Sequence, residues 1–154
     1  MPDWDEITIR PLRWDETDLR QLLAIEQAAF NRFDAYDRQD FERWYHYNPD
    51  LCLAAEIDGH MAGYVITRIL PEQGDLASLA THPDYLRRGV GAALLRATVE
   101  GVRAYGKHQI TLEVRKTNLS ALAFWLNMGC VPFGVQPGFY TDGEAAILMR
   151  KWIG

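Results

Sequence analysis

The spacing of apolar residues along the chain predicts alternating strands and helices. Apolar side chains at every second position indicate strands, and a spacing of three or four residues indicates amphipathic helices. The strand-like apolar segments, some alternating and some continuous, cover 7–12, 51–57, 61–69, 76–81, 109–114, 131–135 and 145–152. The expected helices share the longer period and cover 19–30, 38–47, 89–105 and 119–128. This order predicts one α/β domain over residues 1–154, with a mixed sheet and helices on both faces.

Short sequence motifs mark the ends of several of these helices and strands. Asp15 or Thr17 can cap the first helix, because their side chains accept hydrogen bonds from the first free N–H groups. The pair Asp58-Gly59 between two strands is typical of a tight hairpin turn. Gly106 and Gly129 follow the last two helices, where glycine commonly ends a helix.

Composition narrows the class of protein. The 154 residues are 48% apolar and 24% charged, which fits one globular domain. The cysteines Cys52 and Cys130 lack CxxC spacing and are expected to be reduced core thiols, and the four histidines lack metal-ligand spacing. The acidic start lacks the order of a secretion signal, and no apolar run could cross a bilayer. We therefore expect a cytoplasmic protein with no metal and no membrane partner.

The charge pattern excludes one class of partner. The formal net charge is −5 and no stretch is densely basic, so nucleic acid is a poor candidate. The acidic surface has two interpretations: it attracts a cationic substrate, or it simply keeps the protein soluble.

A glycine-containing loop that leads into a helix is the strongest indication of chemistry. Residues 81–95 read THPDYLRRGVGAALL, so Arg87 and Arg88 precede Gly89, Val90, Gly91 and Ala92 at the start of the expected helix. The first N–H groups of a helix have no internal partner and lie at its positive end, which favours phosphate oxygens. The loop lacks the Gly-Lys-Ser/Thr of a Walker motif and the third glycine of a dinucleotide fold. We expect a pyrophosphate site here; the alternative is a plain turn into a helix.

This loop resembles the signature of the GNAT superfamily of N-acetyltransferases, Gln/Arg-x-x-Gly-x-Gly/Ala. Gly89 and Gly91 match the signature, whereas Leu86 stands where the first polar residue is expected. The resemblance implies acetyl-CoA as acetyl donor and a mixed, mostly antiparallel sheet whose two central strands splay apart. It also implies that the strand ending in Leu79, Ala80 and Thr81 pairs with the pantetheine arm of the donor.

The second half of the chain resembles one branch of that superfamily, the ribosomal-protein alanine N-acetyltransferases. Residues 112–130 (LEVRKTNLSALAFWLNMGC) and 139–149 (FYTDGEAAILM) carry this likeness. The resemblance implies that Glu113 is the general base; the alternative is a salt-bridge partner for Arg115 or for another neighbouring cation. It also implies that Asn118 contacts the donor arm, although Asn118 can equally cap the following helix.

The chain departs from the branch where a general acid is expected. Trp125 stands at the position of the branch's tyrosine, beside the donor, and indole cannot protonate a thiolate. Either solvent supplies the proton or Tyr140 replaces the missing acid. The other interpretations of Tyr140 are a residue that orients the acceptor and a surface aromatic. Ala145 stands where the branch has an aspartate, which weakens the assignment of a peptide substrate.

Together these observations predict transfer of an acetyl group to a primary amine by direct attack on the thioester. The acceptor is a protein N-terminus or a small amine such as a polyamine, amino sugar or drug. The alternative from another class is a non-catalytic acyl-CoA sensor. Aromatic residues near the early helices could line an acceptor pocket or fill the core: Phe33, Tyr36, Phe41, Trp44 and Tyr45. Either a monomer or a homodimer is compatible with the sequence.

Overall fold

The computed structural model describes residues 6–30 and 35–154. The described strands are β1 (Thr8–Pro11), β2 (Cys52–Ile57), β3 (His60–Ile69), β4 (Gly74–Thr81), β5 (Gln109–Arg115), β6 (Val131–Gln136) and β7 (Ala146–Trp152). The described helices are α1 (Glu16–Ala29), α2 (Arg38–Tyr47), α3 (Val90–Ala104) and α4 (Leu119–Asn127), with short 3₁₀ turns at Pro49–Leu51 and Pro83–Tyr85. The predicted order of strands and helices is confirmed.

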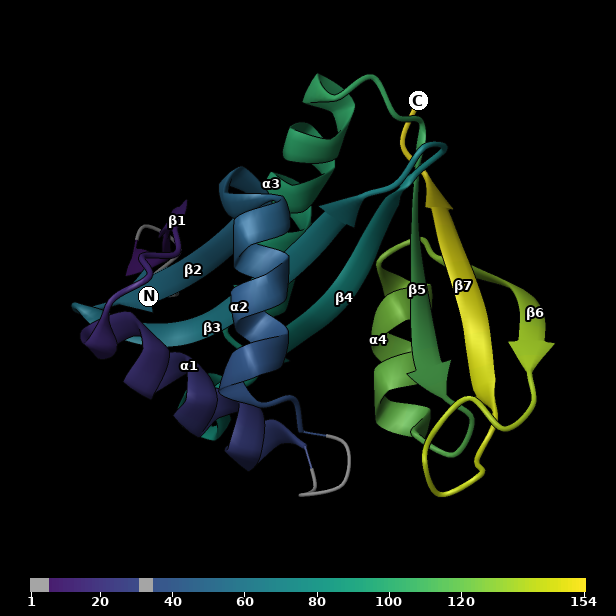
Figure 1. The fold of residues 1–154 in the computed structure, drawn as a ribbon, viewed down its shortest axis with the longest axis horizontal. Helices are drawn as coiled ribbons and strands as arrows, with labels where there is room; N and C mark the ends of the chain where they lie inside the picture. Colours follow the sequence, from purple (N-terminus) through teal and green to yellow (C-terminus); the bar gives the residue numbers. More distant parts are fainter. Residues whose placement is uncertain (1–5, 31–34) are drawn as a thin grey trace.

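The described strands form one sheet in the order β1-β2-β3-β4-β5-β7-β6. Neighbouring strands run antiparallel except at the centre, where β4 and β5 are parallel. These two strands pair only at Gly74↔Ile110 and Asp75↔Thr111. Beyond these pairs they diverge, which opens the middle of the sheet (Figure 1). The expected splay of the central strands is therefore present.

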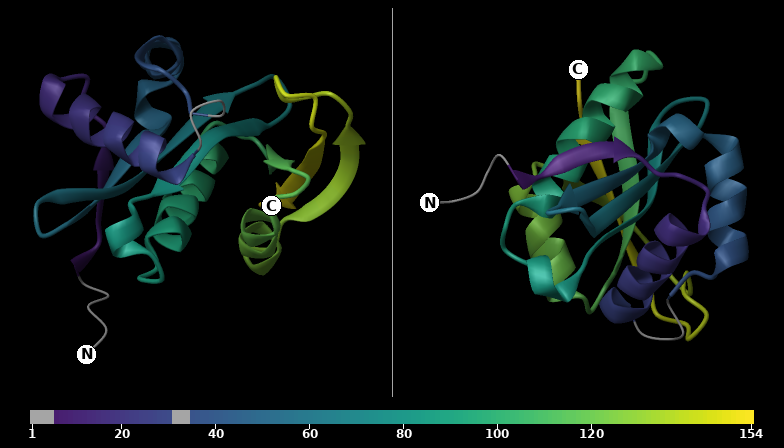
Figure 2. Two further views of the ribbon diagram at one scale, coloured as in Figure 1. Left: turned by 90° about the horizontal axis from the view of Figure 1, so that it is seen from below. Right: turned by 90° about the vertical axis from the view of Figure 1, so that its left-hand side faces the viewer.

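The helices cover both faces of the sheet, as predicted. Helices α1 and α2 lie on one side, and α3 and α4 lie on the other (Figure 2). On the first side Leu22, Ile25 and Phe41 pack against strand residues such as Tyr64 in what we term the α1/α2-side core. The α3/α4-side core includes Leu94, Val99 and Trp125, packed with strand residues such as Val65 and Ile110.

Local signals explain several boundaries. Asp15 rather than Thr17 caps α1, since its carboxylate accepts the Asp18 N–H at 2.8 Å. Asp58 and Gly59 both have positive φ angles, 51° and 78°, as a primed hairpin turn requires. Ala29 falls by its spacing in the apolar stripe of the first expected helix, but it is exposed at the end of α1.

Strand β4 begins two residues before the predicted start and contains a bulge. Ser78 pairs with Ile66 and Leu76 pairs with Thr67, so Ala77 is an extra residue between them. Ala77 packs on the α1/α2-side core, and Ser78 contacts Glu26 of that same side. The bulge therefore turns two consecutive side chains toward α1, beside the point where β4 leaves β5.

Candidate active site

A cavity of about 150 Å³ lies in the gap between β4 and β5. Its lining comes from both strands, from α4, from the connection between α1 and α2, and from the loop between β6 and β7. The cavity brings together five of the predicted site residues: Leu79, Glu113, Asn118, Trp125 and Tyr140. Of the remaining predicted residues, Ala80 and Thr81 end β4 and the others form the glycine loop; none of them lines this cavity.

Glu113 reaches the cavity because of strand alternation in β5. Its neighbours Leu112 and Val114 point into the α3/α4-side core, so Glu113 faces the opposite side. Burial raises the pKa of its carboxyl group from 4.5 to about 7, and the negative charge of Asp75 adds to this effect. Arg68 opposes the rise. A carboxyl group with this pKa can exchange protons readily near neutral pH.

The charged pair beside Glu113 lies where β4 and β5 make their last contacts. Arg68 forms an ion pair with Asp75, whose side chain is buried. Asp75 also accepts a hydrogen bond from the Thr111 hydroxyl at 3.3 Å. These residues come from β3, β4 and β5, so no local pattern in the sequence brings them together.

Arg115 anchors the loop between β6 and β7, which carries Tyr140. Its guanidinium pairs with Asp142 at 2.8 Å and with Glu144 at 2.6 Å, and it lies 4.2 Å from the centre of the Tyr140 ring. Glu144 also accepts the Thr117 N–H at 2.8 Å, which joins the loop to the start of α4. The alternative interpretation of Glu113 gave it Arg115 as a partner; here Arg115 binds the two carboxylates of the loop.

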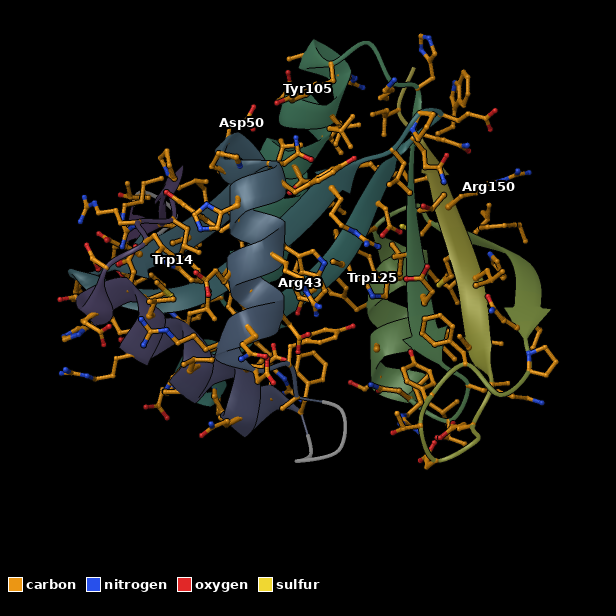
Figure 3. The ribbon with its side chains drawn as sticks, in the orientation of Figure 1. Trp14, Arg43, Asp50, Tyr105, Trp125 and Arg150 are labelled. Carbon is orange, nitrogen blue, oxygen red and sulfur yellow. The ribbon has the colours of Figure 1, made fainter. Side chains whose placement is uncertain are left out.

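Asn118 and Trp125 have structural contacts in addition to lining the cavity. The Asn118 side chain accepts the Ala121 N–H at 3.1 Å, so it caps α4 as its alternative interpretation predicted. Trp125 is only 7% exposed and belongs to the α3/α4-side core. Figure 3 places it on α4 beside the gap between β4 and β5.

The glycine loop has the backbone of an anion site. Gly89 has a φ of 83° and precedes α3 without any side-chain cap, which leaves the N–H groups of Val90, Gly91 and Ala92 at the positive end of the helix. The Val90 side chain is buried, so only its backbone can face a ligand. A Cβ atom on Gly91 would lie 2.9 Å from Cζ of Phe124, so this position admits only glycine without a shift of that ring.

The two arginines and the end of β4 differ in their surroundings. Arg87 is exposed with a φ of 64°, whereas Arg88 pairs with Glu6 at 2.9 Å. Ala80 is buried in the α1/α2-side core, and Thr81 is half-buried at the end of β4. Both residues pair with β3 and neither lines the cavity, so their contact with the donor stays a prediction.

The remaining candidates divide between core and cavity. Phe41, Trp44 and Tyr45 belong to the α1/α2-side core or pack against it, while Tyr36 lines the cavity. Phe33 lies outside the described residues. Within the described residues no group of three or more His, Cys, Asp or Glu side chains is arranged to hold a metal ion. No described helix is long and apolar enough to cross a membrane.

Sequence reasoning missed Glu26, which lies on α1 with no exposed surface. It occupies the same helix face as Leu19 and Leu22, at spacings of seven and four residues. A glutamate within the apolar stripe of a helix is the sequence pattern that could have identified it.

A gap between splayed parallel strands, with an open helix N-terminus beside it, can hold an extended ligand that carries a phosphate group. Residues 17–130 match the Acetyltransferase (GNAT) family, and the chain belongs to that family. It therefore transfers an acetyl group from acetyl-CoA to a primary amine. The open helix terminus and the glycine at position 91 fit the pyrophosphate of this donor.

Three similar proteins support this assignment. A Bacillus subtilis protein, to which ribosomal protein bS18-alanine N-acetyltransferase activity is ascribed, is 30% identical over 150 residues, covering 94% of this chain and 93% of that protein. An N-alpha-acetyltransferase of Sulfurisphaera tokodaii is 30% identical over 146 residues, covering 86% of each chain. The crystal structure of the ribosomal-protein-S18-alanine N-acetyltransferase from Escherichia coli superposes with a TM-score of 0.80 at 29% identity, covering 96% and 94% of the two chains.

Proposed function

We propose that the protein acetylates the α-amino group of a protein N-terminus. Glu113 accepts the proton of the ammonium group, directly or through water, and the free amine attacks the thioester carbonyl carbon. The carbon–sulfur bond then breaks, and Tyr140 protonates the departing thiolate. Two relatives support this acceptor: the Bacillus subtilis protein is named for acetylation of an alanine of ribosomal protein bS18, and the Sulfurisphaera tokodaii protein for N-alpha-acetylation. The reaction would take place in the cytoplasm, where ribosomal proteins are made.

The observation that carries the proposal is the position of Glu113. It lies in the cavity between β4 and β5, where its pKa is raised to about 7 by burial. A carboxyl group exposed to water would be too weak a base for an ammonium group. Burial therefore gives Glu113 the proton affinity that the reaction needs.

The same pKa favours an α-amine over an alkylamine. An α-ammonium group has a pKa near 7.8, so about one molecule in seven is neutral at pH 7. A lysine-like amine with a pKa of about 10.4 is neutral in only about one molecule in 2,500. A base with a pKa of about 7 is closely matched to the first amine and poorly matched to the second.

An acceptor panel tests the proposal. Release of free coenzyme A is followed with acetyl-CoA and equal concentrations of N-terminal peptides, the same peptides blocked at the N-terminus, a polyamine and an amino sugar. Turnover with free N-terminal peptides alone is expected. Turnover of the polyamine or amino sugar in preference to every peptide would refute the proposal, as would acetyl-CoA binding without any turnover.

The role of Glu113 has its own test. Glu113→Gln should lower kcat/KM by about 10²-fold or more at pH 7, because general-base catalysis contributes on that order. Acetyl-CoA affinity should change little. A variant that kept the full pH–rate profile of the parent would show that Glu113 is not the base.

A further inference from the structure

Glu26 is a fully buried carboxylate that contacts two residues of the cavity. Its Oε2 accepts the backbone N–H of Tyr36 at 2.9 Å, and its Oε1 accepts the hydroxyl of Ser78 at 3.4 Å. The Ser78 hydroxyl also lies 3.1 Å from that of Tyr64. Burial raises the pKa of Glu26 to about 7, and the bonds from Tyr36 and Ser78 oppose that rise. A buried polar group of this kind is costly unless its hydrogen bonds are made.

The two partners line the cavity from different elements of the fold. Tyr36 lines it from the connection before α2, and Ser78 lines it from β4, directly after the bulge and before Leu79. One carboxylate on α1 therefore ties the wall formed by the early helices to the strand that faces the donor.

The two walls depend on Glu26 to different degrees. The backbone of β4 is held by its pairing with β3, in which Ser78 faces Ile66 and Leu79 faces Val65. Tyr36 lies in a connection without a strand partner, and its ring packs edge-on against Trp44 at 4.6 Å. Loss of the carboxylate would thus release the Tyr36 backbone while leaving β4 in place.

We infer that Glu26 is a positioning residue of the transfer site, which holds Tyr36 as the wall against which the acceptor amine binds. This inference rests on the proposed function, since it takes the cavity as the meeting place of donor and acceptor. Glu26 acts through Tyr36 on acceptor binding and has little effect on the affinity for acetyl-CoA.

Substitutions of Glu26 test this role through separate kinetic constants. Glu26→Leu removes both acceptor oxygens and should raise the acceptor KM about tenfold or more, with kcat and the Kd of acetyl-CoA within about twofold. Glu26→Gln should stay within about threefold of the parent, because its amide oxygen can still accept the Tyr36 N–H and its amide nitrogen can donate to Ser78. Should Glu26→Leu fail to fold, Glu26→Ala leaves space for water and should show the same rise in KM.

Leu22→Ala is the matched control. Leu22 is fully buried in the same helix but does not line the cavity, so its truncation destabilises the protein and should leave the acceptor KM unchanged. A parent-like KM in Glu26→Leu, or an equal rise in Leu22→Ala, would overturn the inference.

Hydrogen exchange at the Tyr36 amide provides a test that needs no turnover. Exchange at Tyr36 should accelerate in Glu26→Leu, whereas amides of β4 should keep their protection. If no amine supports turnover, the proposed function fails, and the exchange measurement still decides whether Glu26 holds this wall. Unchanged exchange at Tyr36 would overturn the inference.

Discussion

Replacing Glu113 by glutamine should stabilise the fold at alkaline pH while it removes the base. The pKa of Glu113 is raised from 4.5 to about 7, so an ionised carboxylate is disfavoured in the folded protein relative to the unfolded chain. Its contribution to stability is therefore present at low pH and is lost as the pH rises from about 4.5 to about 7. Glutamine has nearly the same shape and no charge to desolvate.

The expected magnitude follows from the same pKa values. At 1.36 kcal/mol for each pKa unit, the raised pKa of Glu113 lowers the free energy of unfolding by about 3 kcal/mol at pH 8 and about 1 kcal/mol at pH 5. Glu113→Gln should therefore exceed the parent in free energy of unfolding by up to about 3 kcal/mol at pH 8. Most of that advantage should disappear at pH 5. Glu26 titrates in the same range but is present in both proteins, so the difference isolates Glu113.

Urea denaturation followed by tryptophan fluorescence measures this difference at both pH values. Glu72→Gln is a suitable control, because Glu72 lies exposed between β3 and β4 and its charge is already in water in the folded protein. A stability difference between Glu113→Gln and the parent that is the same at pH 5 and pH 8 would refute the reasoning. It would mean that the carboxylate is not held in an environment that disfavours its charge.

Two further predictions concern the donor and the leaving group. Saturating acetyl-CoA should raise the melting temperature of the parent by mass action, and Gly91→Glu should abolish that rise. The control is Gly101→Ala, in the same helix but packed against Leu51. It should lower the melting temperature of the free protein and keep the rise with acetyl-CoA. Persistence of the rise in Gly91→Glu would argue against the pyrophosphate site. Tyr140→Phe should lower kcat more than it raises the acceptor KM, and Trp125→Tyr should restore kcat in that background. If neither substitution changes kcat when chemistry is rate-limiting, solvent protonates the thiolate.

The sequence determined the elements and the glycine loop because these depend on short-range physics. The apolar pattern located every described strand and α-helix, and the boundaries of α2 agree at both ends. The turn at Asp58-Gly59, the open start of α3 at Gly89 and the cap at Asn118 follow from backbone preferences within a few residues. The resemblance to the family then supplied acetyl-CoA as the donor for this loop and the role of Glu113, which local physics could not.

Only the tertiary structure decided how these parts meet. The separation of β4 from β5 after two pairs brings Leu79 and Glu113, 34 residues apart, to one cavity. Arg115 binds the carboxylates of Asp142 and Glu144, which lie 27 and 29 residues further along the sequence. Glu26 accepts a hydrogen bond from Ser78, which lies 52 residues further along. The proton affinities of Glu26 and Glu113 depend on how much water these contacts exclude, and that quantity is fixed by packing between distant segments rather than by any local pattern.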